Sequence, residues 1–311
     1  MRYRVLILIW FSLRLVLAAG AQVTNSVMAS ADAFVCTGSA NYESGADLTT
    51  LNFGDAGTLA IAPANAAKGE FRSVLRFSLT NVVSQLDTNF GPGQWTITSL
   101  TLKLTSNYGV GGVQPNNPIF NTISGGQFVI EWMSDDRWVE GSGNPSQPTT
   151  DGITYAELPT YLVALHVPLC TNTYTPPGNN IPVYWSLPLQ TNLVADVRSG
   201  GAVSFYFYAA DTQVAYLFNS YKYGRGNEPY LQVVAMNRPV TLQLLSGSFT
   251  NGVFHLTGLV GARATCQLQV NTNLATTNWI PLASLSADTN GLVQFDDASA
   301  TNAARYYRLI Q

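Results

Sequence analysis

Hydrophobic and polar residues alternate with a period of two in short runs along most of the chain. In one run Leu100, Leu102 and Leu104 alternate with polar residues that include Lys103. In two further runs, Phe128–Met133 and Val203–Tyr208, alternate positions are all hydrophobic, while the positions between them mix polar and bulky residues. A period of two places successive side chains on opposite faces of a strand, so each run predicts a β-strand with its hydrophobic face toward a core.

Turn-forming residues separate these runs, and no long stretch shows the 3.6-residue period of an amphipathic helix. Clusters rich in Gly, Pro and Asn occur at 89–93, 107–117, 141–152 and 176–180. Many short strands joined by such turns favour a sandwich or a jelly roll. The sequence therefore predicts an all-β protein whose main domain, residues 22–236, is a jelly-roll-like β-sandwich.

A second domain is expected from residue 237 to residue 311. The run Asn237-Arg238-Pro239 follows a strand-like segment, and proline stops further ladder pairing. The alternation then restarts in three short segments, at 254–256, 266–270 and 293–295. This region resembles a small immunoglobulin- or fibronectin-III-like module. It predicts a small β-sandwich that acts as a spacer, a stabiliser or an attachment module.

The N-terminus has the pattern of a secretory signal peptide over residues 1–21. A basic start is followed by an apolar stretch, and Ala19-Gly20-Ala21 supplies small residues before a cleavage site. The apolar stretch is shorter than the roughly 20 residues of a spanning helix and contains Arg14. An uncleaved anchor is the alternative. We expect an exported protein, extracellular or on the cell surface, with no membrane attachment after cleavage.

Composition and charge argue against two classes of partner. The chain has 15 basic and 18 acidic residues, and cleavage would remove three basic residues and no acidic one, leaving a net charge of −6. Nucleic acids and anionic lipids both require basic clusters, so neither is expected as a partner. The 46% of hydrophobic residues favours a packed fold over disorder.

Three cysteines remain after cleavage, namely Cys36, Cys170 and Cys266. Export permits disulfides, and Cys36 and Cys170 lie in the same predicted domain, so a bridge between them is one alternative. Free thiols are the other. Cys266 shares the parity of Leu268 and Val270, which predicts a buried hydrophobic residue.

No catalytic motif is found, so a non-catalytic protein is expected. Neither histidine, His166 or His255, lies in a recognisable nucleophile–base or zinc pattern. The richest group of acidic residues comprises Glu131, Asp135, Asp136 and Glu140. A pair of carboxylates could serve a glycosidase, but Asp135-Asp136 between two strand-like segments is more typical of a turn.

An ordered series of short segments suggests a family. The series comprises Ala31–Val35, Asn41-Tyr42, Arg72–Leu79, Ile97–Leu104, Trp132, Trp138–Gly141, Ile153–Tyr155, Pro159, Phe218–Ser220 and Glu228–Leu231. In order and spacing it resembles the DNRLRE domain, a β-sandwich related to carbohydrate-binding module family 96. The resemblance covers about two-thirds of the chain. It implies a jelly-roll-like fold and the binding of a polysaccharide, without naming the glycan.

Candidate glycan-binding residues are cations and tyrosines that face away from the predicted core. Rings can stack on sugars, while cations and amides bind hydroxyls or carboxylates, so an acidic polysaccharide is one ligand of this chemistry. The candidates are Arg72, Arg76, Lys103, Tyr221, Lys222, Tyr223 and Arg225. The alternative is structural, with Arg76 a buried arginine and the tyrosines packing a sheet edge.

No cofactor is expected, apart from a structural calcium by analogy with jelly-roll modules. Asp32 is the proposed ligand, with Asp47, Asp55 or Glu70 as companions. Two other functions stay open. One is an adhesin-like structural scaffold, and the other is a polysaccharide lyase or hydrolase.

Overall fold

The fold is all-β, as the alternation predicted. It was obtained as a computed structural model that describes residues 22–39, 47–107, 120, 125–223, 226–238, 242–261, 264–288, 291–300 and 304–310. The predicted signal peptide and Arg225 lie outside the described residues. Within the described part of the chain, no helix is long and apolar enough to cross a membrane.

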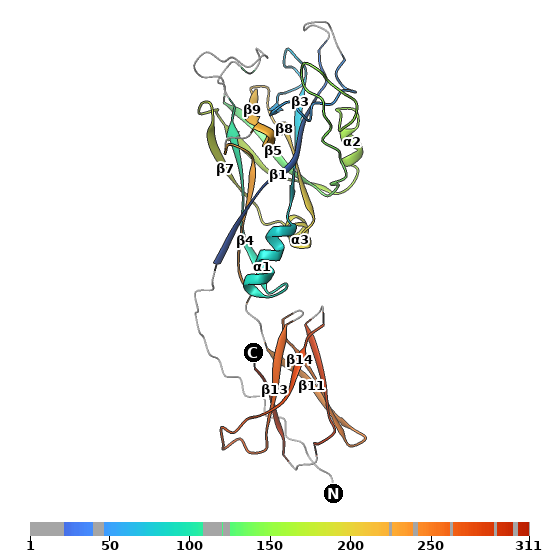
Figure 1. Cartoon of the computed structure of the whole chain (residues 1–311), viewed down its shortest axis with the longest axis vertical. Coiled ribbons are helices and arrows are strands. Elements are labelled where there is room, and N and C mark those ends of the chain that lie inside the picture. Colours follow the sequence, from blue (N-terminus) through green and yellow to red (C-terminus); the bar gives the residue numbers. More distant parts are fainter. Residues whose placement is uncertain are drawn as a thin grey trace. The chain divides into compact units, whose positions relative to one another are not determined.

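The chain divides into two compact units (Figure 1). The large unit contains residues 24–84 and 97–234, and the small unit contains residues 22–23, 85–96 and 235 onward, so the ends of some strands of the large unit extend past these bounds. Strands of the large unit are β1 (Gln22–Cys36), β2 (Thr58–Ile61), β3 (Phe71–Ser78), β4 (Trp95–Ser106), β5 (Gly126–Met133), β6 (His166–Tyr174), β7 (Ile181–Leu187), β8 (Ala202–Ala209), β9 (Tyr216–Asn219) and β10 (Tyr230–Asn237).

Two sheets form the large unit. Sheet A comprises β2, β9, β4 and β7, and sheet B runs in the order β1-β3-β8-β5-β6. Strand β10 lies between β4 and β1 and so connects the two sheets. Strand β1 changes register at Ala29/Ala31, and such a bulge lets one long strand bend between two neighbours.

Aromatic side chains fill the space between the sheets. Phe128 and Tyr174 of sheet B contact Trp185, Tyr216 and Phe218 of sheet A, with ring centroids 4.9–6.1 Å apart. The leucines at 100, 102 and 104 are also buried on the inner side of β4. The predicted core faces of the three alternating runs are therefore confirmed.

The outer face of sheet B is largely covered as well. Trp138, Ile153 and Leu158, from the segment between β5 and β6, pack against Val74 and Met133 on that face. This cover explains why the second face of the run 203–208 carries bulky residues too. A sheet buried on both sides does not show a simple hydrophobic–polar alternation.

Short helices are present that the sequence did not predict. They are α1 (Thr80–Phe90), α2 (Leu158–Tyr161), α3 (Thr191–Ser199) and the 3-10 turn η2 (Tyr221–Tyr223). In α1, Val82 and Leu86 are buried four residues apart, which is a helical spacing. The element spans only about three turns, too few for its period to stand out from the neighbouring strands.

The small unit contains two three-stranded sheets, β11-β12-β15 and β14-β13-β16. Their strands are β11 (Gln243–Thr250), β12 (Val253–Leu259), β13 (Thr265–Asn271), β14 (Ile280–Ser286), β15 (Leu292–Asp297) and β16 (Tyr306–Ile310). The three predicted strands correspond to β12, β13 and β15. Cys266 is buried with Val260 and Val293, as its parity predicted.

The bridge between Cys36 and Cys170, one of the two alternatives, is not present. All three cysteines are free thiols. Cys36 ends β1 and Cys170 lies in β6, with β3, β8 and β5 between them in the sheet. Adjacent strands are about 4.8 Å apart. The two Cα atoms are therefore far beyond the roughly 4.4–6.8 Å that a disulfide requires.

Candidate functional site

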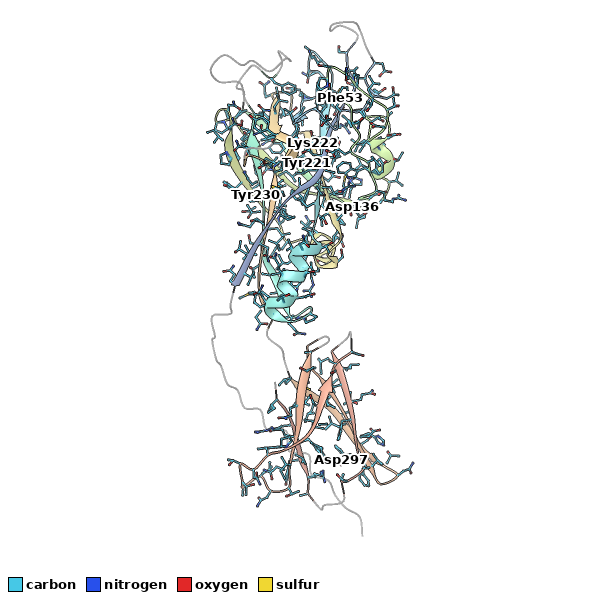
Figure 2. The ribbon with its side chains drawn as sticks, viewed as in Figure 1. Phe53, Asp136, Tyr221, Lys222, Tyr230 and Asp297 are labelled. Carbon is cyan, nitrogen blue, oxygen red and sulfur yellow. The ribbon has the colours of Figure 1, made fainter. Side chains whose placement is uncertain are left out.

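The candidate glycan-binding residues lie at separate places in the large unit rather than on one surface. Arg72 and Arg76 share the outer face of β3, Lys103 lies on β4 of sheet A, and Tyr221, Lys222 and Tyr223 form η2. Figure 2 shows Tyr221 and Lys222 next to one another and Tyr230, the ring beside Lys103, at a different part of the unit. The candidates therefore do not form a single binding surface.

Lys103 is on the predicted side of β4, but it is only 6% exposed. Its ammonium donates to the carbonyl oxygens of Gly226 and Glu228, each at 3.2 Å, and lies 5.0 Å from the centre of the Tyr230 ring. The side of β4 that was expected to face solvent is therefore buried at Lys103. These contacts hold the segment before β10 against sheet A.

Arg76 holds the covering segment on sheet B. Its guanidinium donates to the carbonyl oxygens of Asp136 and Trp138, at 2.7 and 2.8 Å, and stacks on the Trp138 ring at 4.6 Å. The Trp138 indole in turn donates to Ser204 on β8. Arg76 is therefore a half-buried arginine with structural partners, which is the alternative reading of this residue.

Tyr221 and Lys222 belong to a group of polar side chains that joins distant segments. We call it the linking cluster: Asp32, Asn52, Asp55, Glu140, Ser220, Tyr221 and Lys222. The Tyr221 hydroxyl donates to Glu140 at 2.9 Å. The Lys222 ammonium lies 3.2 Å from Asp55, 3.4 Å from Glu140 and 3.2 Å from the Gly54 carbonyl. Burial alone would lower the pKa of Lys222, but these carboxylates outweigh it and raise the pKa.

Asp32 is the buried member of this cluster, at 1% exposure. Its two carboxylate oxygens accept hydrogen bonds from the Ser220 hydroxyl and the Tyr221 backbone N–H, both at 2.8 Å. Burial raises the pKa of Asp32 to about 7, although these two bonds lower it in part. Glu140 adds a smaller upward contribution.

The calcium ligands suggested with Asp32 are bound to other protein groups. Asp55 pairs with Lys222, Glu70 with Arg72, and Asp47 with the hydroxyl of Thr49. Among the described residues, no group of three or more His, Cys, Asp or Glu side chains is arranged to hold a metal ion. Asp32 is instead an internally hydrogen-bonded acid.

Asn52 is the centre of the linking cluster, although the sequence did not single it out. Its side chain is fully buried and donates to the carbonyls of Glu140 and Ile153, at 2.7 and 2.9 Å. Its oxygen accepts the backbone N–H groups of Gly54 and Gly143. A Cβ at Gly143 would lie 2.0 Å from the backbone carbonyl oxygen of Asn52, so only glycine permits this close approach.

A second polar group lies on the outer face of sheet B, beside the covering segment. We call it the face cluster: Glu70, Arg72, Glu131, Tyr155, His166, Tyr206 and Tyr208. At one end the Arg72 guanidinium donates to Glu70 at 2.8 Å and to the Tyr206 hydroxyl at 2.6 Å. It also lies 5.2 Å from the centre of the Tyr155 ring, whose hydroxyl donates to Glu70 at 2.5 Å.

The other end of the face cluster is a carboxylate–imidazole pair. Tyr206 stacks on Tyr208 with ring centroids 5.0 Å apart. Burial raises the pKa of Tyr208, and its proximity and hydrogen bond to Glu131 raise it further. Glu131, on β5, is 3% exposed and binds Nδ1 of His166, the first residue of β6. The imidazole side chain is 43% exposed, and within the described residues its Nε2 has no hydrogen-bond partner.

Of the face cluster, sequence reasoning named only Arg72 as a glycan-binding residue, while Glu70, Glu131 and His166 were considered for other roles. A signal was nevertheless present, because Glu131 and Tyr206 share the outer parity of their strands and are paired in register across β5 and β8. What hid the cluster is that its members come from four strands and two loops. Their proximity follows from the strand order β3-β8-β5-β6, which a single sequence does not specify.

The face cluster combines features that suit a sugar ligand. It offers partly exposed tyrosine rings for stacking, and carboxylate, guanidinium and imidazole groups for hydroxyls. By contrast, the linking cluster satisfies its polar groups with one another and with backbone from four segments. Of the two, the face cluster is the better candidate for a binding site.

Comparisons with known proteins do not identify a family. No family model and no curated protein matches the chain. Solved structures that align with it include β-glucuronidase from Ruminococcus gnavus, at 7% identity and a TM-score of 0.21, over 93% of this chain and 45% of that one. A β-glucuronidase from an uncultured Clostridium sp. aligns at 7% identity and a TM-score of 0.24, over 93% and 42%.

The chain spans less than half the length of these enzymes, and TM-scores of this size carry no argument about fold or activity. The resemblance to the DNRLRE domain stays a prediction.

Proposed function

We propose that the protein is exported and that its large unit binds an extracellular polysaccharide through the face cluster. The observation that carries this proposal is the row of rings and polar groups from Tyr155 and Arg72 to His166. Three of its members, Arg72, Tyr155 and Tyr208, are partly exposed, and the His166 side chain is 43% exposed. A row of aromatic rings with adjacent hydrogen-bonding groups can bind a sugar chain without catalysing a reaction.

The experiment is a binding titration of the purified protein against neutral and acidic polysaccharides, with and without calcium. The test variants are Tyr155→Ala and Tyr208→Ala. Tyr184→Ala is the matched control, because Tyr184 is a 54% exposed tyrosine on sheet A. We expect each test variant to weaken binding about tenfold, which corresponds to about 1.4 kcal/mol for a lost stacking partner, and the control to bind normally.

Two results would contradict the proposal. Saturable binding that depends on Tyr184 and not on Tyr155 or Tyr208 would move the site to sheet A. An absence of binding to every polysaccharide would favour the structural alternative, in which the sandwich is an adhesin-like scaffold.

Acid–base catalysis is a second candidate, favoured by one observation. A buried carboxylate that binds Nδ1 of an exposed histidine orients its Nε2, as a general base requires. The same titration samples can be assayed for new reducing ends and for the ultraviolet absorbance of an unsaturated uronate. Product that disappears in His166→Gln would assign a lyase or hydrolase activity to this pair.

A further inference from the structure

The cation of the face cluster is already neutralised within the protein. Glu70 binds Arg72 through one carboxylate oxygen at 2.8 Å and accepts the Tyr155 hydroxyl with the other at 2.5 Å. The side chain of Glu70 is 15% exposed and that of Arg72 is 29% exposed. A pair this close and partly shielded from water presents little net positive charge to a ligand.

The other ionisable groups of the face cluster do not give it a net positive charge. Glu131 adds a second carboxylate that is almost fully buried. With a neutral imidazole at His166 the cluster carries one net negative charge, and with a protonated imidazole it carries none. A uronate approaching Arg72 would therefore meet Glu70 as a competitor and Glu131 as a like charge.

The other described candidate cations are engaged too. Lys222 lies between two carboxylates, Lys103 is bound to two backbone carbonyls, and Arg76 is bound to two more. Each would have to give up structural contacts in order to bind a sugar carboxylate. In the described part of the large unit, none of these candidates offers a ready-made site for an anionic polymer.

A neutral sugar fits the same groups well. Arg72 uses Nε and one Nη in its two hydrogen bonds, and a guanidinium has five N–H donors, so donors remain for hydroxyl or ring oxygens. His166 Nε2 can exchange a hydrogen bond with a hydroxyl. The rings of Tyr155 and Tyr208 can stack on the apolar face of a pyranose.

We infer that the face cluster selects a neutral polysaccharide over an acidic one, and that Glu70 is the residue that sets this selectivity. This inference rests on the function proposed above, since it names the ligand class of the same site. It makes Glu70 a determinant of specificity that acts by cancelling the charge of Arg72.

The test is the variant Glu70→Gln, which keeps the side-chain shape and leaves Arg72 without its counter-charge. We expect wild-type protein to bind a neutral polysaccharide with less than a twofold change in affinity between 50 and 500 mM salt. We expect the variant to gain binding to a uronate polymer by tenfold or more at 50 mM salt, and to lose that gain at 500 mM. Thermal unfolding confirms that the variant is folded.

The matched control is Asp135→Asn. Asp135 binds Arg137 with both carboxylate oxygens, and the Arg137 side chain is 86% exposed. This change also frees an arginine, but outside the face cluster, so it should give no uronate binding.

Each result decides a different claim. Salt-sensitive uronate binding by the wild type would overturn the inference while leaving polysaccharide binding intact. Neutral binding by the wild type with no uronate gain in Glu70→Gln would reject the role of Glu70. If the wild type bound no glycan of either kind, the proposed function itself would fail.

Discussion

The two polar clusters of the large unit use similar residues for different purposes. Both contain a cation, two or more carboxylates and at least one tyrosine, and the cations Lys222 and Arg72 are equally exposed, at 29%. The linking cluster joins β1, the loop around Asn52, the segment near Glu140 and η2. The face cluster lies mainly along neighbouring strands and ends at an exposed imidazole whose Nε2 has no partner among the described residues.

The difference lies in what the hydrogen bonds connect. In the linking cluster most bonds run to backbone groups of segments that are otherwise joined only by isolated β-bridges, so these bonds supply much of the connection between the segments. In the face cluster most bonds run between side chains of a sheet that is already held by its ladder. Mutations should therefore affect stability most in the first cluster and ligand affinity most in the second.

The largest effect is expected from Asn52→Ala. The change removes four hydrogen bonds and leaves buried carbonyl and N–H groups of three loop segments without partners. We expect a loss of about 4 kcal/mol in the free energy of unfolding, measured by urea denaturation. Glycan affinity of the remaining folded protein should not change. A loss below about 1 kcal/mol would show that these loops are held by other contacts.

The raised pKa of Asp32 should make folding stability depend on pH, with a smaller effect than Asn52→Ala. Burial raises the pKa of its carboxyl from an ordinary 3.8 to about 7, so the folded state binds an extra proton between these values. Stability is then highest at the acidic side of this window and falls as the pH rises toward 7, by up to about 1.4 kcal/mol per unit. Burial raises the pKa of Asp136 to about 6, which adds a decline of the same sign.

Thermal or urea unfolding between pH 5 and pH 7 checks this linkage. We expect the wild type to lose about 3 kcal/mol across that interval. The variant Asp32→Asn, whose amide does not titrate, should show a flatter profile, and Asp136→Asn should flatten it less. An unchanged slope in Asp32→Asn would mean that this carboxyl is ionised in the folded protein at pH 5.

A mutation in the face cluster should lower glycan affinity more than folding stability. We expect His166→Gln to lower glycan affinity about fivefold, or about 1 kcal/mol, because the amide occupies less area and hydrogen-bonds differently. The amide can still donate to Glu131, so the loss of folding stability should stay below that of Asn52→Ala. A stability loss without any change in affinity would show that the Glu131–His166 pair is structural.

Sequence reasoning captured the layers of the fold better than its polar clusters. The parity of Leu100, Leu102 and Leu104 depends on a local period that each strand carries in its own residues, so the buried face could be predicted. The burial of Lys103, by contrast, depends on backbone from the segment before β10. Likewise, Glu131 meets His166 and Tyr208 only through the order of three strands. Such non-local contacts leave no periodic signal.

The segments that suggested a family have structural roles in this molecule. Asp32 binds Ser220, Arg76 stacks on Trp138, and Glu140 binds Tyr221. The first two pairs each join two segments of the series that are far apart in the chain, and the third joins one segment to Tyr221, the residue that follows another. In this molecule these residues hold segments of the sandwich together. Their contacts are structural and do not by themselves indicate a ligand.

The smallest and most selective prediction is a matched pair of hydroxyl deletions, Tyr221→Phe and Tyr208→Phe. Each removes one hydrogen bond to a carboxylate, to Glu140 in the first case and to Glu131 in the second. Tyr221→Phe should cost about 1 kcal/mol of stability and leave affinity unchanged, because its partner belongs to the linking cluster. Tyr208→Phe should change stability less, since the ring and its stack on Tyr206 remain, yet reduce affinity two- to threefold through the loss of a hydroxyl at the binding surface. Urea unfolding and a binding titration give the change in stability and the change in affinity for each variant.

If the two variants lost stability and affinity in the same proportion, the division between the linking cluster and the face cluster would be wrong.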